Sequence, residues 1–245
     1  MSEIVTLEDP LGVAHAAGER FLAAAVEAVR SRGRFVVVLS GGSTPQAMHR
    51  VLTSSPWRSE IPWSRSVVLF GDERCVPPDH EDSNFHMASE TLLDHVGIPK
   101  NRIHRIEGEL DDPAEAARRY ERVLHELYRS EEPSCFDLVM LGIGEDGHTA
   151  SLFPETKALN ENRRLVVANR VPALDSWRIT LTFPALCAAG QVLFLATGEK
   201  KARVVAEAFG GLPHDVPYPC ERVVPKSGRR EILVDRAAAS RLPRR

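Results

Sequence analysis

A valine-rich run of five apolar residues, Phe35–Leu39, narrows the choice of folds more than any other segment of this chain. Unbroken apolar runs of this length are typical of strands covered by helices on both faces, because half-exposed strands alternate polar and apolar residues. The residues before it, Leu11–Arg32, are predicted to form an amphipathic helix, since their apolar positions recur about every 3.6 residues. Gly33 then follows as a typical helix terminator.

The alternation of apolar strands and helices continues along the chain. Further strands are predicted at Val67–Phe70, Phe136–Leu141, Leu165–Ala168, Arg178–Thr182 and Gln191–Ala196. Further helices are predicted at Asn84–His95, from Asp112-Pro113 to about Arg129, and at Glu199–Phe209. This order predicts an α/β fold, an open, mostly parallel, doubly wound (Rossmann-like) sheet with helices on both faces.

No Gly/Ser-rich linker, repeat or low-complexity block interrupts the 245 residues. We therefore expect one α/β domain over residues 1–245, with room for a small subregion around 155–185. The basic residues 240–245 are expected to form a frayed tail.

Charge and cysteine usage exclude several classes of protein. The net charge is −3, so no overall positive field attracts nucleic acid or a membrane surface. The four cysteines, at 75, 135, 187 and 220, form no C-x-x-C pair, so we expect neither a disulfide framework nor a thiolate zinc site. The histidines show no metal-ligand spacing. No signal peptide and no apolar run of membrane-spanning length is visible, and we expect a cytoplasmic protein without a bound metal.

Ligands of open α/β sheets bind beyond the carboxyl ends of the strands, and three loops at such positions are unusual. The first has the sequence SGGSTP. Its Gly41 and Gly42 allow close approach of the backbone to a ligand, and its Ser43 and Thr44 carry hydroxyl groups. Thr44 precedes a proline, as an N-cap does at a helix start, and a helix N-terminus suits a phosphate. A tight, capped turn without a ligand would explain the loop equally well.

The second loop is Gly71-Asp72-Glu73-Arg74. Charges crowded at a strand end cost repulsion and desolvation unless they meet a ligand or one another. Arg74 is suited to bidentate contact with phosphate, and Asp72 could orient a base or a substrate hydroxyl. Taken alone, the loop is explained better by a surface ion pair.

The third loop, GIGEDGHTAS, contains a G-x-G-x-x-G dinucleotide motif. We reject a dinucleotide site because the motif lies in the middle of the sheet and the next strand, Leu165–Asn169, ends without an acid for the ribose. His148 lies two residues from Asp146 in this glycine-rich loop. A histidine with an adjacent acid at a strand end indicates a general base, although a lone histidine is more often structural.

Taken together, these loops resemble the 6-phosphogluconolactonases of the oxidative pentose phosphate pathway. The resemblance rests on Ser40–Pro45 (SGGSTP), Gly71–Arg74 (GDER) with Ser83-Asn84, Gly142–Pro154 (GIGEDGHTASLFP), Arg178–Thr182 (RITLT) and Thr197–Ala202 (TGEKKA). It covers roughly residues 33–209. The related glucosamine-6-phosphate deaminases share a G-x-D-G-H core but continue toward I-A-F-N-E-P, whereas Thr149–Pro154 (TASLFP) has the lactonase form.

This resemblance implies the sugar-phosphate isomerase/deaminase superfold and hydrolysis of 6-phospho-D-glucono-1,5-lactone by water, without metal or organic cofactor. His148 would be the general base, and either Asp146 or Asp72 would orient it or hold substrate hydroxyls. The phosphate would be bound by Gly41, Gly42, Ser43 and Thr44, with Arg74, Arg178 and Lys201 supplying positive charge. The N–H groups of Gly142, Gly144 and Gly147 are candidates for the oxyanion site.

Two other functions fit parts of this pattern. A sugar-phosphate deaminase or isomerase would use the same phosphate loop, and ammonia release from glucosamine 6-phosphate would reveal it. A non-catalytic sugar-phosphate sensor would need an added DNA-reading or partner domain, for which one α/β core leaves little room. We expect a monomer whose partner is a small sugar phosphate, with no nucleic-acid or membrane partner.

Overall fold

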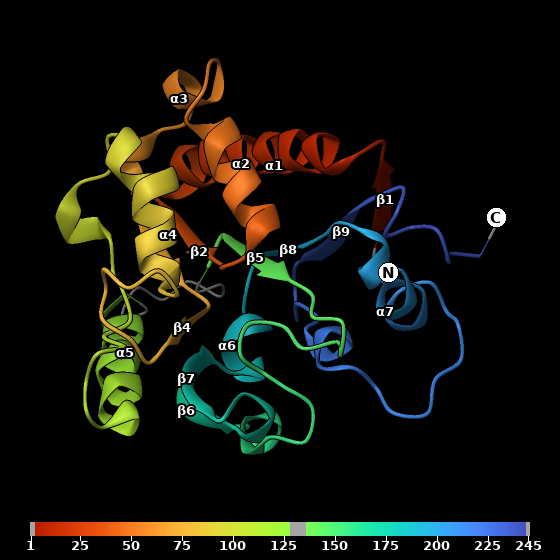
Figure 1. The fold of residues 1–245 in the computed structure, drawn as a ribbon. Helices are drawn as coiled ribbons and strands as arrows, with labels where there is room; N and C mark the ends of the chain where they lie inside the picture. Colours follow the sequence, from red (N-terminus) through yellow and green to blue (C-terminus); the bar gives the residue numbers. More distant parts are fainter. Residues whose placement is uncertain (1–2, 128–135, 244–245) are drawn as a thin grey trace.

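A six-stranded parallel sheet forms the centre of the computed structural model, which describes residues 3–127 and 136–243 (Figure 1). Its order is β1-β9-β8-β5-β2-β3, and every described neighbouring pair is parallel. The strands are β1 (Glu3–Leu7), β2 (Phe35–Leu39), β3 (Ser66–Phe70), β5 (Leu138–Gly142), β8 (Gln191–Ala196) and β9 (Arg229–Asp235). The prediction of an α/β fold with a mostly parallel sheet is confirmed.

A second, smaller sheet is antiparallel and has the order β4-β7-β6. Its strands are β4 (Asp72–Arg74), β7 (Ser176–Leu181) and β6 (Val166–Val171). The two sheets are bonded directly, since the N–H of Leu181 donates to the carbonyl of Gly71 at 2.8 Å. The acidic and basic residues of GDER therefore belong to a strand, not to the loop that we expected.

Helices cover both faces of the large sheet. They are α1 (Pro10–Arg32), α2 (Ser43–Leu52), α3 (Trp57–Glu60), α4 (Asn84–Thr91), α5 (Pro113–Leu127), α6 (Phe183–Leu186) and α7 (Ala202–Ala208). Helix α1 packs on β2, β8 and β9 and against α2, whereas α5, α6 and the small sheet lie on the other side in Figure 1.

Two predicted helices differ from the observed ones. The helix expected over Asn84–His95 ends at Thr91, and a 3₁₀ turn at Leu93–His95 follows. Leu92 and Leu93 are both buried, and because adjacent helical residues point about 100° apart, a break brings both into the core. The helix expected at Glu199–Phe209 likewise begins as a 3₁₀ turn before α7. The expected end of α5 near residue 129 lies outside the described residues.

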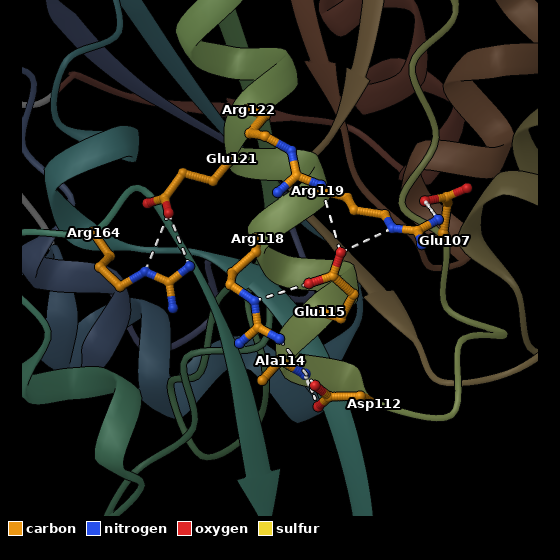
Figure 2. A network of polar contacts seen from close by, with 9 residues as sticks. All are labelled: Glu107, Asp112, Ala114, Glu115, Arg118, Arg119, Glu121, Arg122 and Arg164. Atoms are coloured by element: carbon orange, nitrogen blue, oxygen red, sulfur yellow. Dashed lines mark hydrogen bonds and ion pairs between the residues drawn. The ribbon is translucent and has the colours of Figure 1, made fainter.

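Helix α5 joins the small sheet to the rest of the domain through charged side chains (Figure 2). Both oxygens of Glu121 are used: Oε1 accepts the N–H of Leu165 at 2.6 Å, and Oε2 accepts two N–H groups of Arg164 at 2.8 and 3.1 Å. Nearly two turns earlier, Glu115 contacts three arginines, Arg118, Arg119 and Arg122. The Glu121 contacts fix the start of β6, which pairs with β7, the strand that carries Arg178 of the site described below.

The C-terminus of α1 provides a direct test of backbone conformation. Gly33 has φ +72° and no atom within 4 Å of an added Cβ, so Gly33→Ala introduces backbone strain without a steric clash. We expect this variant to lose about 1 kcal/mol in the free energy of unfolding, measured by denaturant titration. Gly97→Ala is the matched control: Gly97 is equally open but lies outside the left-handed region, so about 0.5 kcal/mol of stabilisation is expected. Equal losses in both variants would contradict this explanation.

Candidate active site

The three motif-bearing segments meet at one cavity of about 400 Å³ at the carboxyl ends of β2, β5 and β8. All the predicted site residues line it except Asp146 and Gly147. Lys201 lines the cavity, whereas its neighbour Lys200 does not. Segments from distant parts of the chain are thus brought together, as expected for the edge of a parallel sheet.

The first wall of the cavity is the N-terminus of α2. Gly42 is the N-cap, with φ +106°, so the helix begins at Ser43 and the prediction that Thr44 is the N-cap is wrong. Thr44 Oγ1 instead lies 2.9 Å from Thr197 Oγ1, within hydrogen-bond distance. The first N–H groups of a helix have no carbonyl partner within it, and Ser43 and Thr44, the first residues of α2, line the cavity. The buried hydroxyl of Ser40 also has no hydrogen-bond partner among the described residues.

Gly41 has a different role from Gly42. A Cβ atom at this position would lie 1.9 Å from Oδ1 of Asn84, so the glycine is needed for close packing. The amide nitrogen of Asn84 donates to the carbonyl of Asp72 at 2.9 Å and to its carboxylate at 3.2 Å. Asn84 therefore connects the α2 loop to β4.

The second wall holds two arginines that face each other. Arg74 on β4 is paired in register with Arg178 on β7. Like charges opposite one another destabilise a sheet unless an anion lies between or beside them. Neither guanidinium forms an ion pair within residues 3–127 and 136–243, and only carbonyls, of Asp82 and Trp177, accept from them. Burial, and then the charge of Arg74, lowers the pKa of Arg178. Together with Lys201, the pair makes this end of the cavity suited to an anion such as phosphate.

The surface ion pair that would otherwise explain GDER is not formed. Glu73 is 2% exposed and accepts hydrogen bonds from the N–H groups of Arg74, Asn84 and Phe85 at 2.7–2.9 Å and from Ser83 Oγ at 3.1 Å. Burial raises the pKa of Glu73, while these backbone donors oppose the rise. Glu73 thus fixes β4 to the start of α4.

His148 lies in the glycine-rich loop after β5 and lines the same cavity, with one ring nitrogen already engaged. Its Nδ1 is 2.6 Å from Oδ1 of Asp146, and its ring stacks on Phe153 with centroids 4.0 Å apart and planes 25° apart. Burial acts to raise the pKa of Asp146, but the hydrogen bond and charge of His148 outweigh it, so the pKa lies below its ordinary value. An ionised Asp146 favours the tautomer with a proton on Nδ1 and a free lone pair on Nε2.

Asp72 occupies a separate position. Its Oδ2 accepts a hydrogen bond from Ser151 Oγ at 2.6 Å, and its Oδ1 accepts from Asn84. Asp146, rather than Asp72, is therefore the acid in contact with His148. The carboxylate of Asp72, which is 8% exposed, lines the cavity between the arginines and the histidine loop.

The glycine loop uses some of the N–H groups that we expected to be available. The N–H of Gly144 donates to the carbonyl of His148 at 2.8 Å, and that of Gly147 donates to Gly144 at 3.1 Å. In this conformation neither is free for an oxyanion, so the expectation for these two groups is wrong. Gly142 lines the cavity at the end of β5, and its carbonyl accepts from Thr149 Oγ1 at 2.8 Å.

Comparison with known proteins agrees with this geometry. The sequence model of the family described as glucosamine-6-phosphate isomerases/6-phosphogluconolactonase matches residues 8–233. The chain belongs to this family. A 6-phosphogluconolactonase from Nostoc sp. is 38% identical over 217 residues, 88% of each chain. One from Mycobacterium tuberculosis is 39% identical over 239 residues, 93% of each chain.

A solved structure titled 6-phosphogluconolactonase from Trypanosoma cruzi has a TM-score of 0.87 and 28% identity, and the match covers 100% of this chain and 98% of that one. These findings confirm the family that the motifs suggested. Because the family includes two kinds of enzyme, its name alone leaves the reaction to be argued from the site.

Several residues that line the cavity were not predicted as site residues from the sequence. Asn84, Ser151 and Phe153 line the cavity, and all three lie within motifs quoted for the resemblance without a role of their own. Thr197 also lines it. Their positions inside specific motifs are the signal that could have identified them.

Within residues 3–127 and 136–243, no group of three or more histidine, cysteine or acidic side chains is arranged to hold a metal ion. No helix in this described part is long and apolar enough to cross a membrane. That the reaction needs no metal or organic cofactor stays a prediction.

Proposed function

We propose that this enzyme hydrolyses 6-phospho-D-glucono-1,5-lactone to 6-phosphogluconate. The observation that carries the proposal is a single cavity lined both by His148, whose Nδ1 contacts Asp146, and by the facing Arg74 and Arg178. A sugar-phosphate lactone has the matching parts, an electrophilic carbonyl at one end and a phosphate dianion at the other. The 6-phosphogluconolactonases among the relatives support the same reaction.

In the proposed mechanism the nucleophile is water. Nε2 of His148 takes a proton from the water as its oxygen attacks the lactone carbonyl, while Asp146 stabilises the resulting imidazolium through Nδ1. The tetrahedral intermediate then breaks its bond to the ring oxygen, which receives the proton from His148. No covalent bond forms to the protein. Stacking on Phe153 limits rotation of the imidazole and keeps its geometry constant through both steps.

The phosphate is placed against the N-terminus of α2. There the N–H groups of Ser43 and Thr44 and the hydroxyl of Ser40 serve as donors, and Arg74, Arg178 and Lys201 supply charge. Binding an anion relieves the repulsion between the facing arginines. Asp72 is placed to accept from substrate hydroxyls, since its carboxylate lies between the two ends of the cavity.

The deciding experiment is hydrolysis of the lactone made in situ from glucose 6-phosphate by its dehydrogenase. We expect the product to form well above the spontaneous rate, and titration of the released acid measures this rate. The same sample is then given glucosamine 6-phosphate. Ammonia release, with no acceleration of lactone hydrolysis, would overturn the proposal in favour of a deaminase.

A further inference from the structure

The loop that carries His148 has little regular structure to hold it. This catalytic loop, residues 142–151, contains Gly147 at φ +78° and Ala150 at φ +48°. Its internal hydrogen bonds link Gly144 to His148 and Gly147 to Gly144. Glycine adopts such a φ freely, whereas a non-glycine residue such as Ala150 keeps it only where the surrounding structure enforces it.

The end of the loop is anchored by Ser151, which donates to Asp72 and Thr180, and its centre is contacted by a distant part of the chain. A Cβ atom on Gly147 would lie 2.2 Å from Cδ1 of Tyr218 and 2.5 Å from its Cγ, so the Gly147 backbone lies directly against the tyrosine ring. Two residues further on, the N–H of Cys220 donates to the carbonyl of Gly147 at 3.0 Å. Both contacts are made to the residue between Asp146 and His148.

Tyr218 is itself held in place from several directions. Its N–H donates to Oε1 of Glu221 at 2.8 Å, and its hydroxyl donates to Glu207 on α7. The ring of His214 stacks on it at 5.3 Å, and Nε2 of His214 lies 2.7 Å from the same Glu221 oxygen. The ring is thus fixed in position before it meets Gly147.

We propose that Tyr218 is a positioning residue for His148 and Asp146, an inference that rests on the proposed function. Its ring supports Gly147 and thereby keeps the imidazole aimed at the lactone carbonyl. Tyr218 is not among the described residues that line the substrate cavity, whereas the residues proposed to bind the phosphate are. Its loss should therefore affect turnover and leave substrate binding unchanged.

The test compares Tyr218→Ala, which removes the ring, with Tyr218→Phe, which keeps the ring and loses only the hydroxyl. We expect Tyr218→Ala to lower kcat about 10- to 100-fold with KM changed less than about twofold, because small misplacements of a catalytic group are costly. Tyr218→Phe should restore near wild-type kcat. Val216→Ala, at an exposed position in the same segment, is the control and should leave kcat and KM unchanged.

A second measurement is independent of activity. Hydrogen–deuterium exchange of the unliganded protein should show faster uptake in residues 142–151 in Tyr218→Ala and not in Tyr218→Phe. Should the alanine variant fail to fold, Tyr218→Leu takes its place, since it keeps apolar volume without a flat ring.

The outcomes separate the two proposals. An inactive wild type refutes the lactonase function, and the positioning role is then decided by exchange alone: unchanged uptake in Tyr218→Ala refutes it. An active wild type with unchanged kcat in Tyr218→Ala also refutes it. Equal losses in the alanine and phenylalanine variants would place the requirement on the hydroxyl and Glu207, which contradicts a role for the ring.

Discussion

His148→Ala should lower kcat for lactone hydrolysis by about 10²- to 10⁴-fold, the usual contribution of a positioned general base. Of the described residues that line the cavity, His148 is the only histidine, and the variant loses the Nε2 that is proposed to take a proton from water while Nδ1 contacts Asp146. KM should change little, since the proposed phosphate donors belong to other segments of the chain than the loop of His148. The spontaneous rate is measured in parallel, because this lactone opens readily without enzyme.

The matched control is His125→Ala. His125 is exposed on α5 and does not line the cavity. We expect wild-type turnover from this variant. Affinity for 6-phosphogluconate should be the same in both histidine variants, which shows that the cavity is intact. Unchanged turnover in a folded His148→Ala would remove His148 from the mechanism.

Arg178→Ala should raise KM for the phosphorylated lactone about 10- to 100-fold, since a charge-assisted hydrogen bond contributes about 1.5–3 kcal/mol. Hydrolysis of the unphosphorylated glucono-1,5-lactone should not change. The free protein should lose no stability, because the substitution also removes the repulsion with Arg74 in the unliganded sheet. Steady-state kinetics on both substrates and a thermal melt without ligand measure these three effects.

The control for charge is Arg170→Ala. Arg170 lies on the neighbouring strand β6 and pairs with Asp175, and it does not line the substrate cavity. It should leave KM unchanged. If Arg178→Ala instead lowered only kcat, the guanidinium would act at the reacting carbonyl and the phosphate assignment would be wrong.

The central strands could be predicted from sequence because their surroundings leave a clear pattern. Strands β2 and β8 have the predicted bounds, since both are buried along their whole length and contain no charged residue. The edge strand β1 was missed because it has a neighbour on one side only and several exposed residues. Strand β9 begins with two arginines and has only three consecutive apolar residues, and β4 has none, so neither shows an apolar run as long as those of β2 and β8.

For the candidate site, the sequence could predict which loops meet. The sequence could not decide whether Asp146 or Asp72 contacts His148, because both carboxylates lie in motifs. Only the fold shows that the carboxylate of Asp72 accepts hydrogen bonds from Ser151 and Asn84. The same holds for Gly144 and Gly147, whose N–H groups are used by a turn that no spacing rule reveals. Tyr218 lies in none of the quoted motifs, so only the tertiary structure shows its contact with the catalytic loop.

The pairing of the first strand with the last has a consequence for the order of folding. Glu3 on β1 lies opposite Glu231 on β9, and β9 is the only described neighbour of β1. During synthesis β1 therefore remains without its pairing strand until nearly the whole chain has been made. Contacts between such distant residues slow folding, and unpaired strands are prone to aggregate. Truncation after residue 228 should thus leave β1 without a partner even though the cavity residues are all present.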